Sequence, residues 1–295
     1  MGKDAERKET RDNSRCQMRD RNLSCEIELS LCGRVDLISA MNLALPAELA
    51  QDYKSPSQQA RVVTQSWARD NLFCVNCSSL QLTATREGTE ANDLTCPHCS
   101  LRYELKSKSA PIISKIMDAG YDAMMRAIRA DRTPNLVLLH YEKPQWTIRN
   151  LFLVPHFAFS ESSIEKRNPL RDTAERHGHV LCNIVLKNIP IDAKIPLITN
   201  GVVSSPIKIR AHFKRLKPLK EIGVKQRGWT LDVLNAIHRL GKKEFTTTDT
   251  YVLIRELEKL HPDNHRVREK IRQQLQVLRE RNLLLHVDRN RWRLP

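Results

Sequence analysis

The sequence predicts an α/β domain that carries a zinc ribbon, followed by a C-terminal winged-helix domain. Two Cys-x2-Cys pairs at zinc-ligand spacing lie in the first part. Short apolar strands flanked by helical patterns continue to about residue 205, as in α/β folds. Beyond about residue 228, three short helical patterns and a terminal hairpin replace them. We therefore expect an N-terminal extension over 1–45, the α/β domain over 46–205, a linker over 206–227 and the winged helix over 228–295.

The N-terminal extension has little to bury. Its first 24 residues are rich in charged side chains and asparagine, which predicts a disordered tail, and the rest has no assigned role. This stretch lacks the apolar segment of a secretory signal. No apolar run in the chain approaches the roughly 18 residues that would cross a bilayer. We expect a soluble intracellular protein.

The zinc prediction rests on Cys74, Cys77, Cys96 and Cys99. Eighteen residues separate the two pairs, and four thiolates at such spacing close a tetrahedron around Zn²⁺. Two disulfides are the alternative, which is weak in a chain without a secretory signal. Four protein ligands leave no open position, so this Zn²⁺ is expected to be structural. Cys182 stands alone and is predicted to be a small buried hydrophobic residue.

Periodicity predicts the elements of the first domain. Ala60, Val63 and Trp67 follow a helical pattern that starts at Ser57. The further expected elements are a strand over 101–108, a helix over 112–132 and two buried strands over 135–141 and 151–154.

The candidate catalytic residues are Asp93, Glu104 and Lys106. Residues two apart on a strand face the same side, so Glu104 and Lys106 should share a face while Leu105 points into the core. Two converging carboxylates can hold Mg²⁺, which can activate water for attack on a phosphodiester, and a nearby ammonium can offset the developing charge. The alternative is a solvated strand edge, which the spacing alone would favour. A zinc ribbon that fixes Asp93 and a separate DNA-binding candidate shift the balance to a nuclease site.

The C-terminal pattern is typical of a winged helix. One helix is expected near Trp229, and a second follows Thr246, which forms a capping-box pattern with Asp249. A third follows Asp263 and Asn264. Two strands, over 283–287 and 291–294, are predicted to form the hairpin.

The third helix is the candidate DNA-reading element. Its apolar stripe is Val267, Ile271, Leu275 and Leu278. Arginine and glutamine suit base edges, and arginine and lysine also hold phosphates. The alternative is a solvated helix face, but few acidic residues offset the cations. The predicted DNA-contacting residues are Arg266, Arg268, Lys270, Arg272, Gln273, Gln276 and Arg279, with Arg289 at the hairpin.

The charge distribution favours a nucleic-acid partner. The chain carries a formal net charge of +15, and residues 208–295 hold 22 Lys and Arg against 10 Asp and Glu. Basic surfaces attract polyanions through counterion release. A membrane partner is not expected, because no strongly amphipathic helix with exposed large apolar residues appears.

The sequence resembles the DpnI family of methyl-directed type II restriction endonucleases from about Tyr53 to Pro295. The segments that carry the resemblance are 53–61, the two cysteine pairs, Asp93, Glu104 to Lys108, 169–170, 182–184, 227–230 and, most specifically, 270–279. So many matches in the same order leave little room for chance.

The resemblance implies a PD-(D/E)xK nuclease domain with an embedded zinc site, followed by a winged helix. It implies that Asp93 and Glu104 bind catalytic Mg²⁺, that Lys106 assists the water and that Zn²⁺ is structural. The implied substrate is double-stranded DNA at adenine-methylated GATC sites, read by both domains. We accordingly expect a monomer in the bacterial cytoplasm.

Two positions depart from the family pattern. Relatives carry Thr-Glu where this chain has Thr64-Gln65. They also place a tryptophan of the methyl-adenine pocket where this chain has His179, whose imidazole offers less apolar surface than an indole. His179 is retained as a predicted DNA contact. The competing hypothesis is a zinc-containing winged-helix regulator that binds DNA without cutting it.

Overall fold

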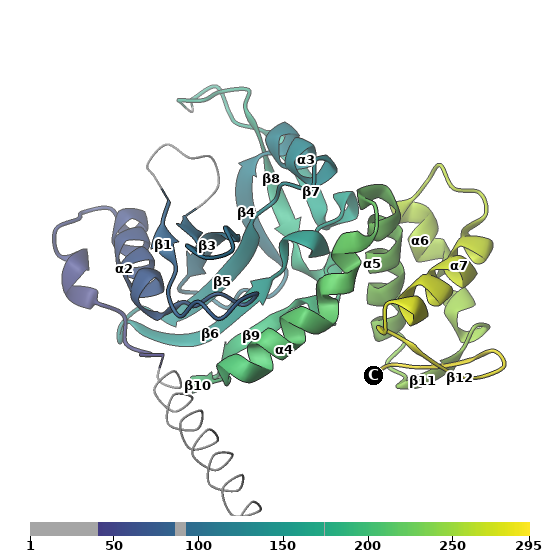
Figure 1. Ribbon diagram of the computed structural model, residues 1–295. Coiled ribbons are helices and arrows are strands. Elements are labelled where there is room, and N and C mark those ends of the chain that lie inside the picture. Colours follow the sequence, from purple (N-terminus) through teal and green to yellow (C-terminus); the bar gives the residue numbers. More distant parts are fainter. Residues whose placement is uncertain (1–40, 86–92, 174) are drawn as a thin grey trace, which may run out of the picture. The chain divides into compact units, whose positions relative to one another are not determined.

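The computed structural model describes residues 41–85, 93–173 and 175–295. The prediction of a disordered tail over the first 24 residues lies outside these ranges. Residues 42–295 form one compact unit, and Figure 1 shows the arrangement of its elements. No helix in the described part of the chain combines the length and the apolar character that a membrane span requires.

A mixed sheet forms the centre of the first domain (Figure 1). Its strand order, among the described residues, is β1-β2-β3-β5-β6-β9-β10. β3 and β5 run parallel, and the other neighbours are antiparallel. The strands are β1 (Thr83–Ala84), β2 (Leu94–Thr95), β3 (Arg102–Lys108), β5 (Asn135–Glu142), β6 (Thr147–Val154), β9 (Ile195–Thr199) and β10 (Val202–Val203). The predicted strands over 101–108, 135–141 and 151–154 are therefore confirmed as β3, β5 and β6.

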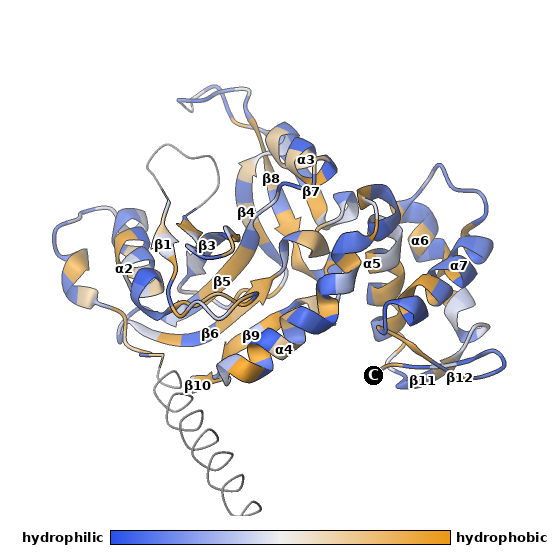
Figure 2. Ribbon diagram, in the orientation of Figure 1, coloured by the Kyte–Doolittle hydropathy of each residue, from blue (hydrophilic) through white to orange (hydrophobic). Residues whose placement is uncertain are grey.

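The core follows the central strands. Leu136 to Leu139 in β5 are all at most 2% exposed, so this strand is covered on both faces, as its continuous apolar run predicts. Figure 2 shows apolar residues concentrated along these strands. Leu105 lies on the same face of β3 as Tyr103, which is 1% exposed, but is itself only half-buried; Glu104, on the other face, is also buried.

A second sheet corrects one prediction. Residues expected to begin a helix at 112 instead form β4 (Lys115–Gly120), which pairs with β8 (Val180–Val185), and β8 pairs with β7 (Ile164–Pro169). Burial alternates along β4, with Ile116 and Asp118 buried and Met117 exposed, which is the strand period of two. Only the second half of the predicted segment is helical, as α3 (Tyr121–Arg129). Pairing with β8 decides the conformation here, and local periodicity does not reveal it.

Helices cover the sheets. α2 (Pro56–Asn71) confirms the predicted helix, begins with a proline at its first position, and buries Val63 and Trp67. α4 (Pro206–Leu216) lies within the expected linker and contacts β9. Short 3₁₀ turns complete the domain: η1 (Ala47–Ala50), η2 (His156–Ala158), η3 (Glu161–Ser163), η4 (Leu186–Asn188), η5 (Ile191–Ala193) and η6 (Lys217–Glu221).

The C-terminal part is a winged helix, as predicted. Its elements are α5 (Val224–Arg239), β11 (Glu244–Thr246), η7 (Asp249–Leu253), α6 (Ile254–Leu260), α7 (Val267–Glu280), β12 (Leu285–Asp288) and β13 (Arg291–Arg293), with strand order β11-β13-β12. The first helix starts earlier than expected, at Val224. The capping box is present, because Thr246 N donates to Asp249 Oδ2 and Asp249 N donates to Thr246 Oγ1.

Candidate active site

The four cysteines of the predicted zinc ribbon lie together. Their Sγ atoms all lie within 4.8 Å of one another. Cys74 and Cys99 approach to 3.5 Å, as do Cys77 and Cys96. These separations are too long for disulfides and close to the roughly 3.8 Å edge of a tetrahedral zinc–thiolate site. The four residues could therefore hold Zn²⁺.

Hydrogen bonds from neighbouring groups reach the cysteine sulfurs. Burial raises the pKa of the Cys74 thiol to about 12 and also raises that of Cys77. The backbone N–H groups of Cys99 and His98 lower the pKa of Cys96 to about 6 against the effect of its own burial. The buried Tyr103 hydroxyl donates to Cys74 Sγ at 3.3 Å and accepts from Val75 N. Such hydrogen bonds orient metal ligands. They also attach the cluster to β3, the strand that carries Glu104 and Lys106.

Asp93 is fixed at the start of the second cysteine pair. Its Oδ2 accepts a 2.7 Å hydrogen bond from Leu105 N, and its Oδ1 accepts from Gln65 Nε2 at 3.1 Å. The Asp93 backbone also bonds to Tyr103 O. The carboxylate therefore lies against β3 at the level of Glu104 and Lys106.

Glu104 and Lys106 share one face of β3, as predicted. Lys106 Nζ lies 2.7 Å from Glu104 Oε1 and also 2.7 Å from Asp118 Oδ1. The Asp118 side chain is 1% exposed, and its Oδ2 has no hydrogen-bond partner among the described residues. One ammonium is thus shared by two buried carboxylates.

Burial and crowding of like charges shift the titration of this group. Burial, followed by the Asp118 carboxylate, raises the pKa of Glu104 to about 7 against the opposing effect of Lys106, and Asp93 adds to the increase. Although burial lowers the pKa of Lys106, Glu104 and Asp118 raise it above its usual value. Both pKa values can rise because a single ammonium cannot neutralise several carboxylates. A divalent cation would relieve the excess negative charge, so these residues fit Mg²⁺.

Two residues of this site were not predicted from the sequence. Gln65 reaches Asp93 from α2, and its amide can donate where a glutamate would repel the carboxylate. This contact gives a physical account of the Thr64-Gln65 departure. Asp118 could not be predicted as a site residue, because the helix predicted over 112–132 is wrong at this position. Residues 115–120 (Lys-Ile-Met-Asp-Ala-Gly) do not alternate between apolar and polar side chains, so no local pattern predicts this strand.

His179 lies at the end of the hairpin between β7 and β8. Its side chain is exposed, and a Cβ atom added at Gly120 would approach His179 Nε2 to 3.1 Å. The imidazole therefore rests over the backbone where β4 ends, two residues from Asp118. Cys182, on β8, is fully buried as predicted.

The predicted DNA-reading helix is α7. Its apolar stripe, Val267, Ile271, Leu275 and Leu278, is buried. Most predicted contact residues project outward: Arg266, Arg268, Arg272, Gln273, Gln276, Arg279 and Arg289 are exposed, and Lys270 is half-buried.

Tyr251 contacts two of the exposed arginines of α7. Arg268 lies over its ring, with 4.1 Å from Cζ to the centroid, and Arg272 Nε donates to its hydroxyl at 2.8 Å. Lys270 Nζ donates to Gln273 Oε1 at 2.8 Å. Pre-positioned guanidinium groups are suited to phosphates and base edges.

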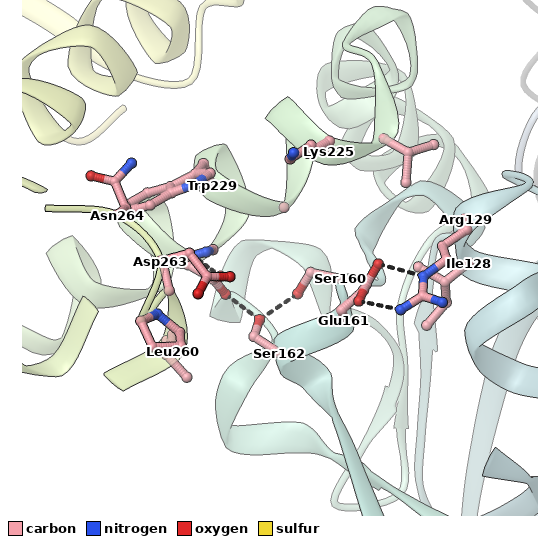
Figure 3. A pocket seen from close by; sticks show the side chains of 15 residues that line it. Ile128, Arg129, Ser160, Glu161, Ser162, Lys225, Trp229, Leu260, Asp263 and Asn264 are labelled. Carbon is pink, nitrogen blue, oxygen red and sulfur yellow. Dashed lines mark hydrogen bonds and ion pairs between the residues drawn. The ribbon is translucent and has the colours of Figure 1, made fainter. Parts of the chain in front are cut away.

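A cavity of about 660 Å³ lies beside α5 and is shown in Figure 3. Ser160 and Ser162 line it from the first domain, and Ser162 Oγ donates to Asp232 Oδ1 at 2.6 Å. Asp232 Oδ2 in turn lies 2.8 Å from His261 Nε2, and the His261 ring stacks on Trp229. These hydrogen bonds connect the first domain to the winged helix.

Comparison with known families agrees with this architecture. Residues 41–222 match the DpnI family, described as the Dam-replacing family, and residues 225–293 match its C-terminal domain, described as the Dam-replacing HTH domain. The first match alone covers more than half of the chain. The chain therefore belongs to the DpnI, or Dam-replacing, family of restriction endonucleases, in which a DNA-binding winged helix follows the first domain.

Proposed function

We propose that this protein is a Mg²⁺-dependent endonuclease of the PD-(D/E)xK type that cleaves double-stranded DNA at adenine-methylated GATC sites. The observation that carries the proposal is the convergence of Glu104 and Lys106, 2.7 Å apart, beside an Asp93 carboxylate held on the same strand. Family membership supplies the class of reaction.

Each residue has a separate task in the proposed mechanism. Asp93 and Glu104 would hold Mg²⁺, which supplies a polarised phosphodiester and a more acidic bound water. Leu105 N and Gln65 fix the Asp93 carboxylate in place. Lys106 keeps its proton and donates a hydrogen bond to the attacking water or to the phosphate oxygen that gains charge.

The remaining predicted groups bind rather than react. Zn²⁺ held by the four cysteines would stabilise the loop that presents Asp93. The exposed cations of α7 and Arg289 would hold DNA, with Gln273 and Gln276 available to base edges. His179 would meet DNA beside the active site. We propose that a single chain, acting as a monomer, both binds and cleaves DNA.

The decisive experiment compares plasmids from adenine-methylating and non-methylating hosts, each incubated with the protein and Mg²⁺. The proposed enzyme cuts only the methylated plasmid. A winged-helix regulator leaves both intact, and an unselective nuclease cuts both. Either of the last two results contradicts the proposal.

Three substitutions test the catalytic group. Asp93→Ala, Glu104→Ala and Lys106→Ala should each reduce the cleavage rate at least about a hundredfold. Binding of methylated DNA, measured by fluorescence anisotropy, should remain within a few-fold of the wild type. Lys143→Ala, in the exposed turn between β5 and β6, is the matched control. Wild-type cleavage by any of the three variants would remove that residue from the mechanism.

A further inference from the structure

We propose that Asp118 is a positioning residue that holds the Lys106 ammonium in its catalytic place when Glu104 turns to the metal. This inference rests on the proposed function, because it assigns Lys106 a role in cleavage. Asp118 would touch neither DNA nor Mg²⁺ and would act only through Lys106.

The Lys106 ammonium lies between two carboxylates. Lys106 Nζ lies at the same distance, 2.7 Å, from Glu104 and from Asp118. Glu104 cannot serve Lys106 and a divalent cation equally, because both require its negative charge. Once Glu104 binds Mg²⁺, Asp118 is the carboxylate that remains for Lys106. A long, flexible lysine side chain without such a partner would sample many positions.

The surroundings of Asp118 restrict its carboxylate. It is almost completely buried, and its own Oδ1 also accepts from Ala119 N at 2.8 Å, which restricts the carboxylate. The β4–β8 register shifts between Asp118 and Gly120, an irregularity of the β-bulge kind. Bulges often re-aim a side chain beside an active site.

Burial of the Asp118 carboxylate lowers the stability of the fold. Asp118 Oδ2 is buried without a hydrogen-bond partner among the described residues. An unsatisfied buried carboxylate oxygen destabilises a fold, and a carboxylate retained only for stability would normally be fully hydrogen-bonded. The burial of Asp118 therefore favours a functional role for its charge, and its Oδ1 lies 2.7 Å from the Lys106 ammonium.

The direct test observes the Lys106 ammonium itself. In protein labelled with ¹⁵N-lysine, the Nζ resonance of Lys106, assigned by its loss in Lys106→Met, reports an ammonium held in an ion pair. The resonance should persist in the wild type when Mg²⁺ is added. It should broaden or disappear in Mg²⁺-loaded Asp118→Asn. Loss of the wild-type signal on addition of Mg²⁺ would overturn the inference without any substitution at Asp118.

Kinetics provide the second readout. Asp118→Asn should lower kcat for cleavage of methylated DNA roughly tenfold to a hundredfold while KM stays within about twofold. Asp118→Glu, which keeps the charge, should recover a substantial part of kcat. Glu165→Gln removes the carboxylate that pairs with Lys115 on the same sheet and serves as the control. Wild-type kcat in Asp118→Asn, or equal losses in Asp118→Asn and Asp118→Glu, would contradict the positioning role.

The two proposals fail in different ways. If the wild type cuts no DNA, the proposed function is wrong, whereas the ammonium resonance still decides whether Asp118 holds Lys106. If the wild type cuts methylated DNA and Asp118→Asn matches it, only the inference about Asp118 is wrong. Zinc content and melting temperature of each variant establish that it has folded.

Discussion

At the scale of single residues, the site is defined by excess negative charge. Glu104 is buried between other acids, and the one ammonium that contacts it among the described residues is shared with Asp118. Burial and the Asp118 carboxylate raise the pKa of Glu104 to about 7, so the ionised form is less favoured near neutral pH than in a free glutamate. Sites that bind divalent cations through carboxylates have this character.

The raised pKa of Glu104 predicts a pH-dependent stability without Mg²⁺. Between about pH 4.5 and 7 the folded protein retains a proton that the unfolded chain has released, so the free energy of unfolding falls as pH rises through this window. Glu104→Gln, which mimics the protonated form, should lack this decline. Relative to the wild type it should gain on the order of 2 kcal/mol between pH 5 and pH 8. Urea unfolding in metal-free buffer measures the difference, and parallel pH profiles for the two proteins would contradict it.

Only some residues of this site could be predicted from the sequence. Asp93, Glu104 and Lys106 could be selected because they lie close together in the chain, near the cysteines. Gln65 lies on α2 and Asp118 on β4, and no pattern in their local sequence predicts that they contact Asp93 and Lys106. Only packing of separate elements brings them together.

At the scale of elements, the cysteine loop and β3 behave as one unit. β2, which lies between Asp93 and Cys96, pairs with β3, and Tyr103 of β3 bonds to Cys74. A metal that closes the four thiolates would therefore fix the position of Asp93. Structural zinc can contribute on the order of 10 kcal/mol to such a fold.

Removal of zinc should abolish cleavage through this connection. Cys77→Ser should lose the bound metal, measured by atomic absorption, and should lose cleavage because Asp93 is released. The winged helix buries its own apolar stripe on α7, so DNA binding by this domain should survive. Cys182→Ala, which changes a buried cysteine outside the cluster, should retain one zinc per chain. A zinc-free Cys77→Ser protein that cuts at the wild-type rate would separate the metal from the active site.

β4 illustrates how an element can be misassigned. Its apolar residues fit a helical spacing when they are considered together with those of α3, which follows immediately. The strand forms because β8, more than sixty residues later, supplies its hydrogen-bond partners. Long-range pairing of this kind overrides local propensity.

At the scale of the whole molecule, α5 joins the winged helix to the first domain. Arg227, 2% exposed, pairs with Asp131, and Asn235 Nδ2 donates to Lys187 O at 2.9 Å. Asp232 accepts from Ser162 and pairs with His261. These contacts are polar, and Arg227 and Asp232 are buried in them, so they depend on complete pairing.

Loss of the Asp232 carboxylate should weaken the connection. Asp232→Ala leaves Ser162 and His261 without their partner and should lower the free energy of unfolding by about 3 kcal/mol. Asp263→Ala is the matched control, because Asp263 lines the same cavity but is exposed, and its effect should stay within about 0.5 kcal/mol. Chemical denaturation followed by tryptophan fluorescence measures both. Equal effects of the two substitutions would show that the hydrogen bonds of Asp232 do not stabilise the protein.

Features that depend on the order of nearby residues could be predicted from the sequence. The cysteine spacing predicted a cluster that the structure forms, and the helical stripe of α7 and the terminal hairpin predicted the winged helix. These patterns succeed because ligand spacing and helical periodicity are properties of short segments. Only the tertiary structure reveals that β4 is a strand, that Asp118 and Gln65 reach the candidate catalytic residues, and that α5 packs against the first domain. Those outcomes depend on contacts between residues distant in the chain, whose energies no local pattern contains.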